Sequence, residues 1–312
     1  MRPPCVLSNA RKAGATTMQI PIESLNLQML NVGFAEHDGN WNWQNVRSPF
    51  TRIFCVTDGE AWLHMEGRTI HLTPGHLYII KAHTQHSYEC HGTFNHYYLH
   101  IYEGFKNSTD IFEHYNFPTE VESESFSVTL FQSMCAEHPE ATLPDSDPKS
   151  YDNTTTFVGY VKRYNDMPLW QKMRLRSAIL MLLSVFLREA TPKQWTSNER
   201  MLKVLTFINA NICEAITIDQ LADIACTSVP YLIRLFKKHF DTSPLQYINR
   251  KKIERAQLML ITEDTQCKEI AYKVGFSDNS YFTRLFKKMT GQTPQAYRSY
   301  ASPIETTAPG ST

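Results

Sequence analysis

The feature that most constrains this chain is a duplicated segment near its C-terminal end. Residues 231–247 and 281–297 align without a gap at an offset of 50 residues. The identical pairs are Tyr231/Tyr281, Arg234/Arg284, Leu235/Leu285, Phe236/Phe286, Lys237/Lys287, Lys238/Lys288, Pro244/Pro294 and Tyr247/Tyr297. Chance gives about one identity in such a window. The segment is therefore a duplicated supersecondary unit, and two copies are too few for a solenoid.

The first copy predicts two helices joined by a short turn. Thr217 and Gln220 have the spacing of a capping box that begins a helix. Ser228 is a good N-cap for the next helix, and Pro230 is tolerated in its first turn. The apolar positions expected to face inward in this second helix are Leu232, Leu235 and Phe236.

The second copy follows the same plan. Gly275 is expected to end its first helix in the left-handed conformation, and Ser277 is expected to cap the next helix. Phe282, Leu285 and Phe286 form the inward face of that helix. Two helices joined by such a turn form the helix-turn-helix pattern, whose second helix enters the major groove of DNA by its N-terminal end.

The outward positions of the two second helices carry the chemistry that DNA recognition needs. Arg pairs with guanine through two hydrogen bonds, Asn does the same with adenine, and Lys suits phosphate. The predicted DNA-binding residues are Pro230, Ile233, Arg234, Lys237 and Lys238 in the first copy and Asn279, Ser280, Thr283, Arg284, Lys287 and Lys288 in the second. A merely solvated face explains one such pattern equally well, but the same placement in two copies favours DNA.

A longer signature runs through both copies. It comprises Ile270-Ala271, residues 275–278 and 280–282, Arg284, residues 286–288, Gly291, Thr293-Pro294 and Tyr297-Arg298, with Leu221-Ala222, Ser228, Tyr231-Leu232, Arg234 and Phe236-Lys237 in the first copy. Over about residues 198–300 this signature resembles the AraC/XylS family of transcription regulators.

The resemblance implies seven helices and two recognition helices in successive major grooves. A linker helix over about residues 245–262, which carries Arg250, Lys251, Lys252 and Arg255, would hold them on one face of the DNA. Ile233 is apolar where family members often carry a polar residue. The first copy is therefore expected either to contact a thymine methyl group or to rely on phosphates.

The charge distribution favours a polyanionic partner for the duplicated region. The 312 residues carry 31 Lys and Arg and 31 Asp and Glu, which excludes a uniformly basic binder of nucleic acid. Residues 196–302 hold 15 basic and 10 acidic side chains, whereas residues 1–195 hold 16 and 20. The basic excess thus lies where the predicted recognition helices lie.

The preceding part of the chain predicts a β-barrel. Short alternating segments at residues 52–57, 61–65, 68–72, 76–80 and 97–102 are broken by Gly, Pro and Asn, as in a jelly roll. Residues 57–60 predict a hairpin turn and residues 73–75 a second turn. The run from Gly59 and Gly67 through residues 72–76 to His86 is similar to the cupin-like sensor domain of AraC/XylS regulators. The expected fold class is multidomain α and β: an N-terminal cupin-like jelly-roll β-barrel with helices, then an all-α domain with two helix-turn-helix motifs.

Nine of the twelve histidines lie between His37 and His100, and two interpretations stay open. One is a metal site formed by His64, His83, His86 and His100. The other is a set of neutral histidines that pack in strands or bind a polar ligand. No His-x-His motif of the cupin type occurs, so no metal and no other cofactor is predicted. Aromatic faces with a few polar groups suit sugars, and the predicted ligand-binding residues are Trp41, Trp43, Arg52, His86, Tyr88 and His100.

Composition suggests the domain boundaries. Residues 1–17 and 303–312 are expected to be a flexible arm and tail, residues 18–190 the sensing domain, residues 191–197 a linker and residues 198–302 the DNA-binding domain. The barrel is expected over about residues 25–105, with helices over about residues 107–190. Residues 126–136 and 169–189 predict helices, and residues 138–156 predict a loop. The helix over 169–189 either pairs two subunits, as the resemblance implies, or packs on its own barrel.

The seven scattered cysteines, without CxxC spacing, argue against a disulfide framework and a structural zinc site. No apolar run approaches the ~20 residues of a membrane span, and no secretion signal precedes the chain's first domain. A cytoplasmic protein without membrane contact is expected.

Together these features predict a sequence-specific DNA-binding transcription regulator, an activator that responds to a small-molecule effector such as a sugar. The expected partners are double-stranded promoter DNA, the effector, RNA polymerase and a second copy of the chain. No common catalytic motif occurs, so no enzyme is expected. Two alternatives stay open: a metal-dependent cupin enzyme fused to a DNA-binding module, and a DNA-binding dimer without an effector.

Overall fold

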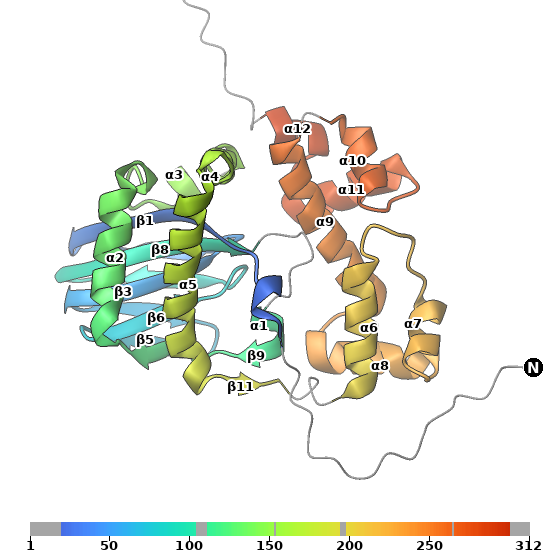
Figure 1. The fold of residues 1–312 in the computed structure, drawn as a ribbon, viewed down its shortest axis with the longest axis horizontal. Coiled ribbons are helices and arrows are strands. Elements are labelled where there is room, and N and C mark those ends of the chain that lie inside the picture. Colours follow the sequence, from blue (N-terminus) through green and yellow to red (C-terminus); the bar gives the residue numbers. More distant parts are fainter. Residues whose placement is uncertain (1–19, 104–110, 153, 194–197, 264, 300–312) are drawn as a thin grey trace, which may run out of the picture. The chain divides into compact units, whose positions relative to one another are not determined.

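The computed structural model describes residues 20–103, 111–152, 154–193, 198–263 and 265–299. It divides into two compact units, Leu25–Thr191 and Pro192–Ser299. Figure 1 draws the elements of both units, which are described separately below. The predicted arm at residues 1–17, the tail at 303–312 and most of the predicted linker lie outside the described residues, and the predicted domain boundaries stay predictions.

The first unit is built on two antiparallel sheets. The five-stranded sheet has the order β1-β8-β3-β6-β10, and the four-stranded sheet has the order β2-β7-β4-β5. The strands are β1 (Leu27–Asp38), β2 (Trp43–Val46), β3 (Thr51–Gly59), β4 (Ala61–Met65), β5 (Arg68–Leu72), β6 (His76–Ile80), β7 (His86–Glu89), β8 (Thr93–Glu103) and β10 (Glu120–Glu122). The two-residue strands β9 (Tyr115–Asn116) and β11 (Thr191–Pro192) lie outside both sheets. Three predicted strands, over residues 61–65, 68–72 and 76–80, are confirmed at those bounds, and the other two are parts of the longer β3 and β8.

The hairpin predicted at residues 57–60 is wrong, because the chain changes sheet there. β3 continues to Gly59, which pairs with Phe94 of β8, whereas β4 pairs with β5 and β7. Gly59 has a φ of 69°, and a Cβ atom at this position would overlap the Thr93 carbonyl group. Glycine alone tolerates this approach, so the turn residues make a crossing between the two sheets.

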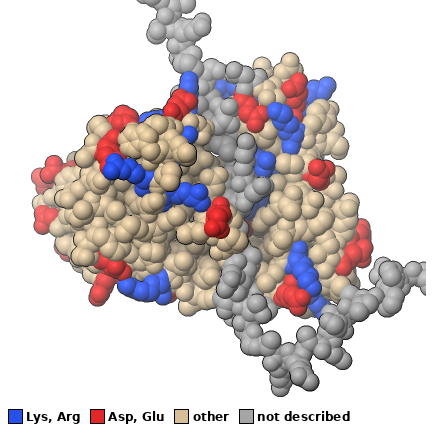
Figure 2. All heavy atoms as spheres, viewed as in Figure 1, with Lys and Arg blue, Asp and Glu red and all other residues tan. Residues whose placement is uncertain are grey.

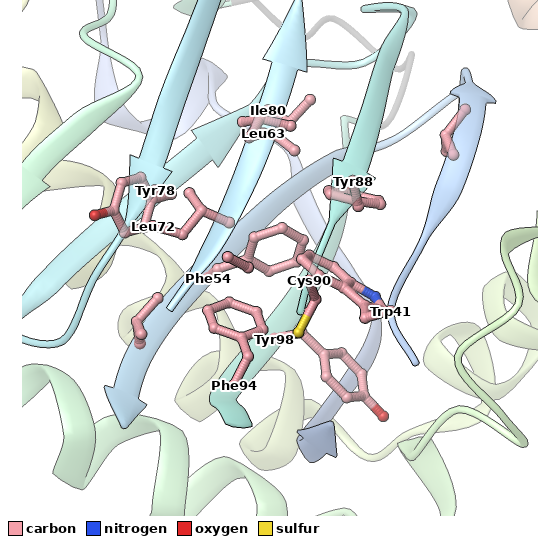
Figure 3. Close-up of a cluster of buried hydrophobic side chains, with 13 residues drawn as sticks. Trp41, Phe54, Leu63, Leu72, Tyr78, Ile80, Tyr88, Cys90, Phe94 and Tyr98 are labelled. Atoms are coloured by element: carbon pink, nitrogen blue, oxygen red, sulfur yellow. The ribbon is translucent and has the colours of Figure 1, made fainter. Parts of the chain in front are cut away.

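The inner faces of the two sheets share one aromatic core (Figure 3). Phe54 and Tyr78 come from the five-stranded sheet, and Leu63 and Tyr88 come from the four-stranded sheet. Burial alternates along β4, as expected for a sheet that exposes one face to water. Residues 51–56 of β3 are buried without alternation, because that strand lies inside a sheet whose outer face is covered.

Helices provide this cover (Figure 1). α2 (Ser125–Glu137) packs on β1 and β8, α4 (Thr154–Asp166) on β1, and α5 (Leu169–Glu189) on β1 and β10. The helices predicted over residues 126–136 and 169–189 are confirmed. The loop predicted over 138–156 instead contains η2 (Pro139–Ala141), α3 (Pro148–Tyr151) and the start of α4, because a proline at the first position starts a helical turn without strain. The short helix α1 (Ile111–His114) lies before α2, and η1 (Ile22–Ser24) is grouped with the second unit.

The second unit is all-α, and its described residues form the seven helices that the resemblance implies. They are α6 (Glu199–Ala210), α7 (Ile218–Ile224), α8 (Val229–Phe240), α9 (Pro244–Thr262), α10 (Cys267–Lys273), α11 (Asn279–Thr290) and α12 (Pro294–Ser299). One apolar core lies between α6, α7, α8 and the start of α9. A second core lies between the rest of α9, α10, α11 and α12. Each copy of the repeat thus has its own core, and α9 contributes to both.

The predicted helix ends are confirmed in all but one case. The Thr217–Gln220 capping box forms, and α8 begins after Ser228 with proline in its first turn. Gly275 has a φ of 81° just after α10. The cap predicted at Ser277 is wrong: Asp278 is the N-cap of α11, and its Oδ1 accepts a hydrogen bond from the Ser280 amide at 2.7 Å. A carboxylate accepts this bond and also stabilises the positive end of the helix dipole.

Among the helices that the structure describes, none combines the length and the apolar character required to cross a bilayer.

Candidate functional site

The second helix of each repeat, α8 or α11, buries one face and exposes the other. Leu232, Leu235 and Phe236 of α8 lie in the first core. Phe282 and Phe286 of α11 lie in the second core, while Leu285 is only half-buried against it. Because the buried positions recur three and four residues apart, the opposite face of each helix is left to solvent.

All eleven predicted DNA-binding residues lie on α8 or α11, and none is buried. Ile233, Asn279 and Thr283 are half-buried, whereas the others are exposed: Pro230, Arg234, Lys237, Lys238, Ser280, Arg284, Lys287 and Lys288. Each lysine pair lies in the last turn of its helix, where a positive charge also stabilises the helix dipole. Both copies therefore present an arginine near mid-helix and two lysines after it. Their contact with DNA stays a prediction.

The equivalent tyrosines of α8 and α11, Tyr231 and Tyr281, make different contacts. In α8 the guanidinium of Arg234 lies 4.9 Å from the centre of the Tyr231 ring. In α11 the hydroxyl of the equivalent Tyr281 accepts a hydrogen bond from Asn249 Nδ2 of α9 at 3.1 Å. Identical residues in the two copies thus have different neighbours.

The distribution of charge alone does not identify the exposed faces of α8 and α11. On the face of the molecule drawn in Figure 2, Lys and Arg side chains are scattered among Asp and Glu. This mixture agrees with the zero formal charge of the chain. Recognition is therefore expected to depend on the placement of particular side chains rather than on a broad positive field.

The first unit contains a cavity of about 270 Å³ between the barrel and the segment that follows α2. This volume is close to the lower end of the range of small-molecule pockets, about 300 Å³. Strands β1, β3 and β8, the loop after β1 and residues 142–151 form its wall. The lining residues are Phe34, Ala35, Glu36, His37, Asn40, Trp41, Phe54, His96, Tyr98, His100, Thr142, Leu143, Asp145, Ser146 and Tyr151.

Three of the histidines among the lining residues are buried. His37 Nε2, His96 Nδ1 and His100 Nδ1 have no hydrogen-bond partner among the described residues. Burial lowers the pKa of all three imidazoles, and for His96 and His100 the shift is large. The rings are therefore neutral at pH 7, and a neutral imidazole offers one donor and one acceptor.

Trp41, Phe54 and Tyr98 line the cavity and also belong to the aromatic core drawn in Figure 3. The Trp41 ring stacks on Tyr88 with 4.0 Å between centroids and on Phe94 with 5.1 Å. His37 lies 5.3 Å from Trp41 in a stacked arrangement. Flat apolar faces beside neutral imidazole rings suit a ligand with both CH faces and hydroxyl groups.

Of the six predicted ligand-binding residues, Trp41 and His100 line the cavity and the other four do not. Arg52 is 1% exposed and its guanidinium forms an ion pair with Asp152 at 2.8 Å. Burial raises the pKa of the Asp152 carboxyl, and the charge of Arg52 opposes that shift. The cation is thus engaged by the protein itself rather than presented to a ligand.

The remaining three candidates do not line the cavity. Tyr88 is buried in the barrel core, and its hydroxyl lies 2.8 Å from His86 Nε2. Burial and, to a smaller extent, the charge of Arg52 lower the pKa of His86 to about 4. Trp43 is half-buried on β2, packed against the core.

Sequence reasoning missed His37 and His96 as cavity residues. β8 runs from Thr93 to Glu103, so His96, Tyr98 and His100 alternate onto one face. The predicted strand began at residue 97 and left His96 out. Extending the alternation by two residues would have found it.

The described residues contain no group of three or more His, Cys, Asp or Glu side chains arranged to hold a metal ion. Of the four histidines in the metal interpretation, His64 lies 2.6 Å from Glu89, and His86 contacts Tyr88. His100 instead lines the cavity beside Tyr98 and Tyr151. The alternative of a metal-dependent cupin enzyme therefore has no ligand set in this part of the chain.

Comparison with known families matches both units. Residues 221–300 match the family described as a helix-turn-helix domain, and residues 32–106 match the family described as an AraC-like ligand binding domain. The second match runs from Val32 in β1 through β8, and so it includes His37, His96 and His100 of the cavity wall.

Individual relatives match part of this chain. The bifunctional transcriptional activator/DNA repair enzyme AdaA of Bacillus subtilis is 33% identical over 116 residues, which are 37% of this chain and 55% of AdaA. The raffinose operon transcriptional regulatory protein RafR of Pediococcus pentosaceus is 31% identical over 117 residues, 38% of this chain and 42% of RafR. The crystal structure of the DNA-binding domain of AdpA with a target DNA is 26% identical, with a TM-score of 0.31, and covers 32% of this chain and 90% of that domain. The chain spans about half the length of the curated relatives it matches.

Proposed function

This chain belongs to the AraC/XylS family of transcription regulators, and from that premise we propose that it binds promoter DNA in a sequence-specific manner through α8 and α11. The duplication carries the proposal: both helices expose an arginine and two lysines on the face opposite their buried core. The arginines are suited to guanine edges and the lysines to phosphates. The proposed contacts are the eleven residues named above.

Selection of bound sequences from a random pool of duplex DNA, at near-physiological salt, tests this proposal. Two enriched blocks about one helical turn apart would support two working recognition helices. A single block would mean that one copy reads bases, with α11 favoured because α8 carries Ile233. Binding without enrichment that vanishes as salt rises would refute sequence-specific recognition.

We further propose that the cavity of the first unit binds a small uncharged effector with several hydroxyl groups, of which a sugar is the simplest example. Neutral His37, His96 and His100 supply hydrogen-bonding groups, and no Lys or Arg is among the lining residues. Glu36 and Asp145 on the wall disfavour an anion. The effector is proposed to shift the population of conformations with different DNA affinity, which requires unequal binding to the two states.

A thermal-shift screen that pairs neutral sugars with the corresponding sugar acids tests this effector class. A neutral sugar should raise the melting temperature and its acid should not. The stabilisation should disappear in His96→Ala and persist in the matched control His71→Ala, because His71 lies on β5 outside the cavity. Stabilisation by acids alone would contradict the class proposed here.

The exposed face of α5 supports a proposed homodimer. Leu169, Met173 and Met181 are 73%, 61% and 43% exposed and recur at helical spacing, next to Trp170 at 56%. Four large apolar side chains on one helix are more than scattered exposure explains. The proposed occupant is the same helix of a second copy, because a two-fold axis brings one apolar stripe onto its equal.

The rest of the proposal concerns where the protein works and which partners it contacts. We propose that it works in the cytoplasm as an activator that contacts RNA polymerase, without enzymatic activity, cofactor or membrane contact. The proposed domains are residues 18–190 for sensing, 191–197 as linker and 198–302 for DNA binding. AdaA is named as both an activator and a DNA repair enzyme, so elemental analysis and an assay of the purified protein for DNA repair test the non-enzymatic assignment.

A further inference from the structure

Lys252 lies in the middle of α9, the helix that both repeats share. Its side chain is only 4% exposed. Nζ donates hydrogen bonds to the carbonyl oxygens of Glu214 and Gly275, both at 2.8 Å, and lies 5.5 Å from the centre of the Phe276 ring. A buried ammonium group is costly unless it is hydrogen-bonded, so these contacts hold the two carbonyl groups in place.

The two carbonyl groups belong to different repeats. Glu214 lies between α6 and α7, at the entry to the first helix-turn-helix. Gly275 lies between α10 and α11, in the turn of the second. Lys252 therefore joins the backbone of the first repeat to the backbone of the second through one side chain.

The apolar cores of the two repeats are separate, and α9 packs into both. Tyr247 and Ile248 of α9 belong to the first core, and Ile253 and Ala256 belong to the second. Lys252 lies at the boundary between these two sets. The backbones also meet here: a Cβ atom on Gly275 would lie 2.5 Å from the Cys213 carbonyl oxygen and from Lys252 Nζ.

We infer that Lys252 is a positioning residue that fixes α8 and α11 relative to each other, and so sets the spacing between the two DNA blocks that the protein accepts. The inference rests on the proposed binding of DNA by both helices. A recognition helix that is turned away from its groove loses its base contacts. Two linked helices gain affinity over one only when the geometry lets both contact the DNA at the same time. Lys252 itself contributes no charge to the DNA, because its ammonium group is turned inward.

The test compares the full-length protein with Lys252→Met on a set of duplexes. The set holds the selected two-block sequence, versions with a few base pairs added or removed between the blocks, and a version with one block only. Lys252→Met should bind the two-block sequence about tenfold more weakly and should lose the preference for one spacing. Its affinity for the single block should match that of the unchanged protein, and so should the salt dependence on that block, because no phosphate contact is lost.

Two further variants keep the result interpretable. Lys203→Met removes the same charge from an exposed position of α6 that is 57% exposed, and it should leave the spacing preference intact. Lys252→Arg keeps a cationic donor and should restore most of the preference. If Lys252→Met does not fold, Lys252→Gln, which keeps one amide donor, is measured in the same way and should show a smaller loss.

The outcomes separate this inference from the proposed function. If the unchanged protein binds no two-block sequence, the proposed use of both helices fails and the inference fails with it. If it does bind, and Lys252→Met keeps the same spacing preference, only the inference is overturned. A salt slope lowered by about one in Lys252→Met would also overturn it, because that result identifies a phosphate contact.

Discussion

Replacing Arg284 with alanine tests base recognition by α11 more directly than any other single change. Arg284 is exposed on the outer face of α11, while Phe282 and Phe286 hold the helix in the second core. The change removes no buried contact, so the stability of the domain should stay within about 0.5 kcal/mol. A loss of DNA affinity then reports the contact and not the fold.

The expected magnitude follows from the chemistry of the contact. One bidentate arginine–guanine pair is worth about 1–3 kcal/mol of discrimination, which is roughly 5- to 150-fold in Kd. The loss should appear with the selected sequence and should shrink when the base at the contacted position is changed. Fluorescence anisotropy with both duplexes, at one fixed salt concentration, measures the two values.

Lys287→Ala is the matched comparison on the same helix. Lys287 lies in the last turn of α11 and is exposed. Its removal should weaken binding to all sequences alike and lower the salt slope by about one. Unchanged affinity and unchanged sequence preference in Arg284→Ala would refute the assignment of α11 as a base-reading helix.

Three further predictions concern the first unit, whose tryptophan fluorescence reports urea unfolding. Asp152→Asn leaves Arg52 buried without its counter-ion and should lower the free energy of unfolding by about 3–5 kcal/mol. The control Arg174→Ala breaks an exposed ion pair with Glu137 and should lower it by less than about 1 kcal/mol. Equal losses in the two variants would contradict the argument. The folded-state pKa of His86 is about 4 against an unfolded value of ~6.5, so the unfolded chain binds the proton first as the pH falls. Between pH 6.5 and 4 the unit should therefore lose about 3 kcal/mol from His86, and an unfolding midpoint that does not move over this range would be inconsistent with it. Met173→Asp should shift the proposed dimer toward monomer in sedimentation experiments, whereas the control Lys162→Asp, at an exposed position of α4, should not. If the unchanged protein is already a monomer, the proposed dimer is refuted.

The helical half of the fold was predictable because its signals are local. Capping residues at Thr217 and Ser228, a left-handed glycine at 275 and apolar spacing along α8 and α11 each act within one or two turns. The sheet crossing at Gly59 was not predictable in this way. Glycine is required at this position because the Thr93 carbonyl group, 34 residues further along the chain, leaves no room for a side chain. A local turn pattern does not distinguish a hairpin from a crossing, because both need the same residues.

The cavity was predictable only in part for the same reason. Trp41 and His100 were found by their residue types, but residues 142–151 come from a proline-rich segment that the sequence identifies only as a loop. Its place on the wall depends on distant contacts, such as the Leu143 amide that donates to the Tyr98 hydroxyl at 2.8 Å. Arg52 was predicted to contact the ligand from its residue type, and only the position of Asp152 shows that its charge is already paired.

Duplication explains why the two recognition helices share residues, and their neighbours explain why they need not share a role. Tyr231 holds the Arg234 guanidinium against its ring, and an arginine leaves that contact only by giving up a cation–π interaction. Tyr281 is tied to α9 through Asn249, and no aromatic ring contacts the Arg284 guanidinium among the described residues. Arg284 is thus expected to reach a base edge without first breaking a cation–π contact, while Arg234 and the apolar Ile233 beside it are expected to make phosphate and methyl contacts. The same sequence motif is therefore expected to read bases in α11 and to position the protein on DNA in α8.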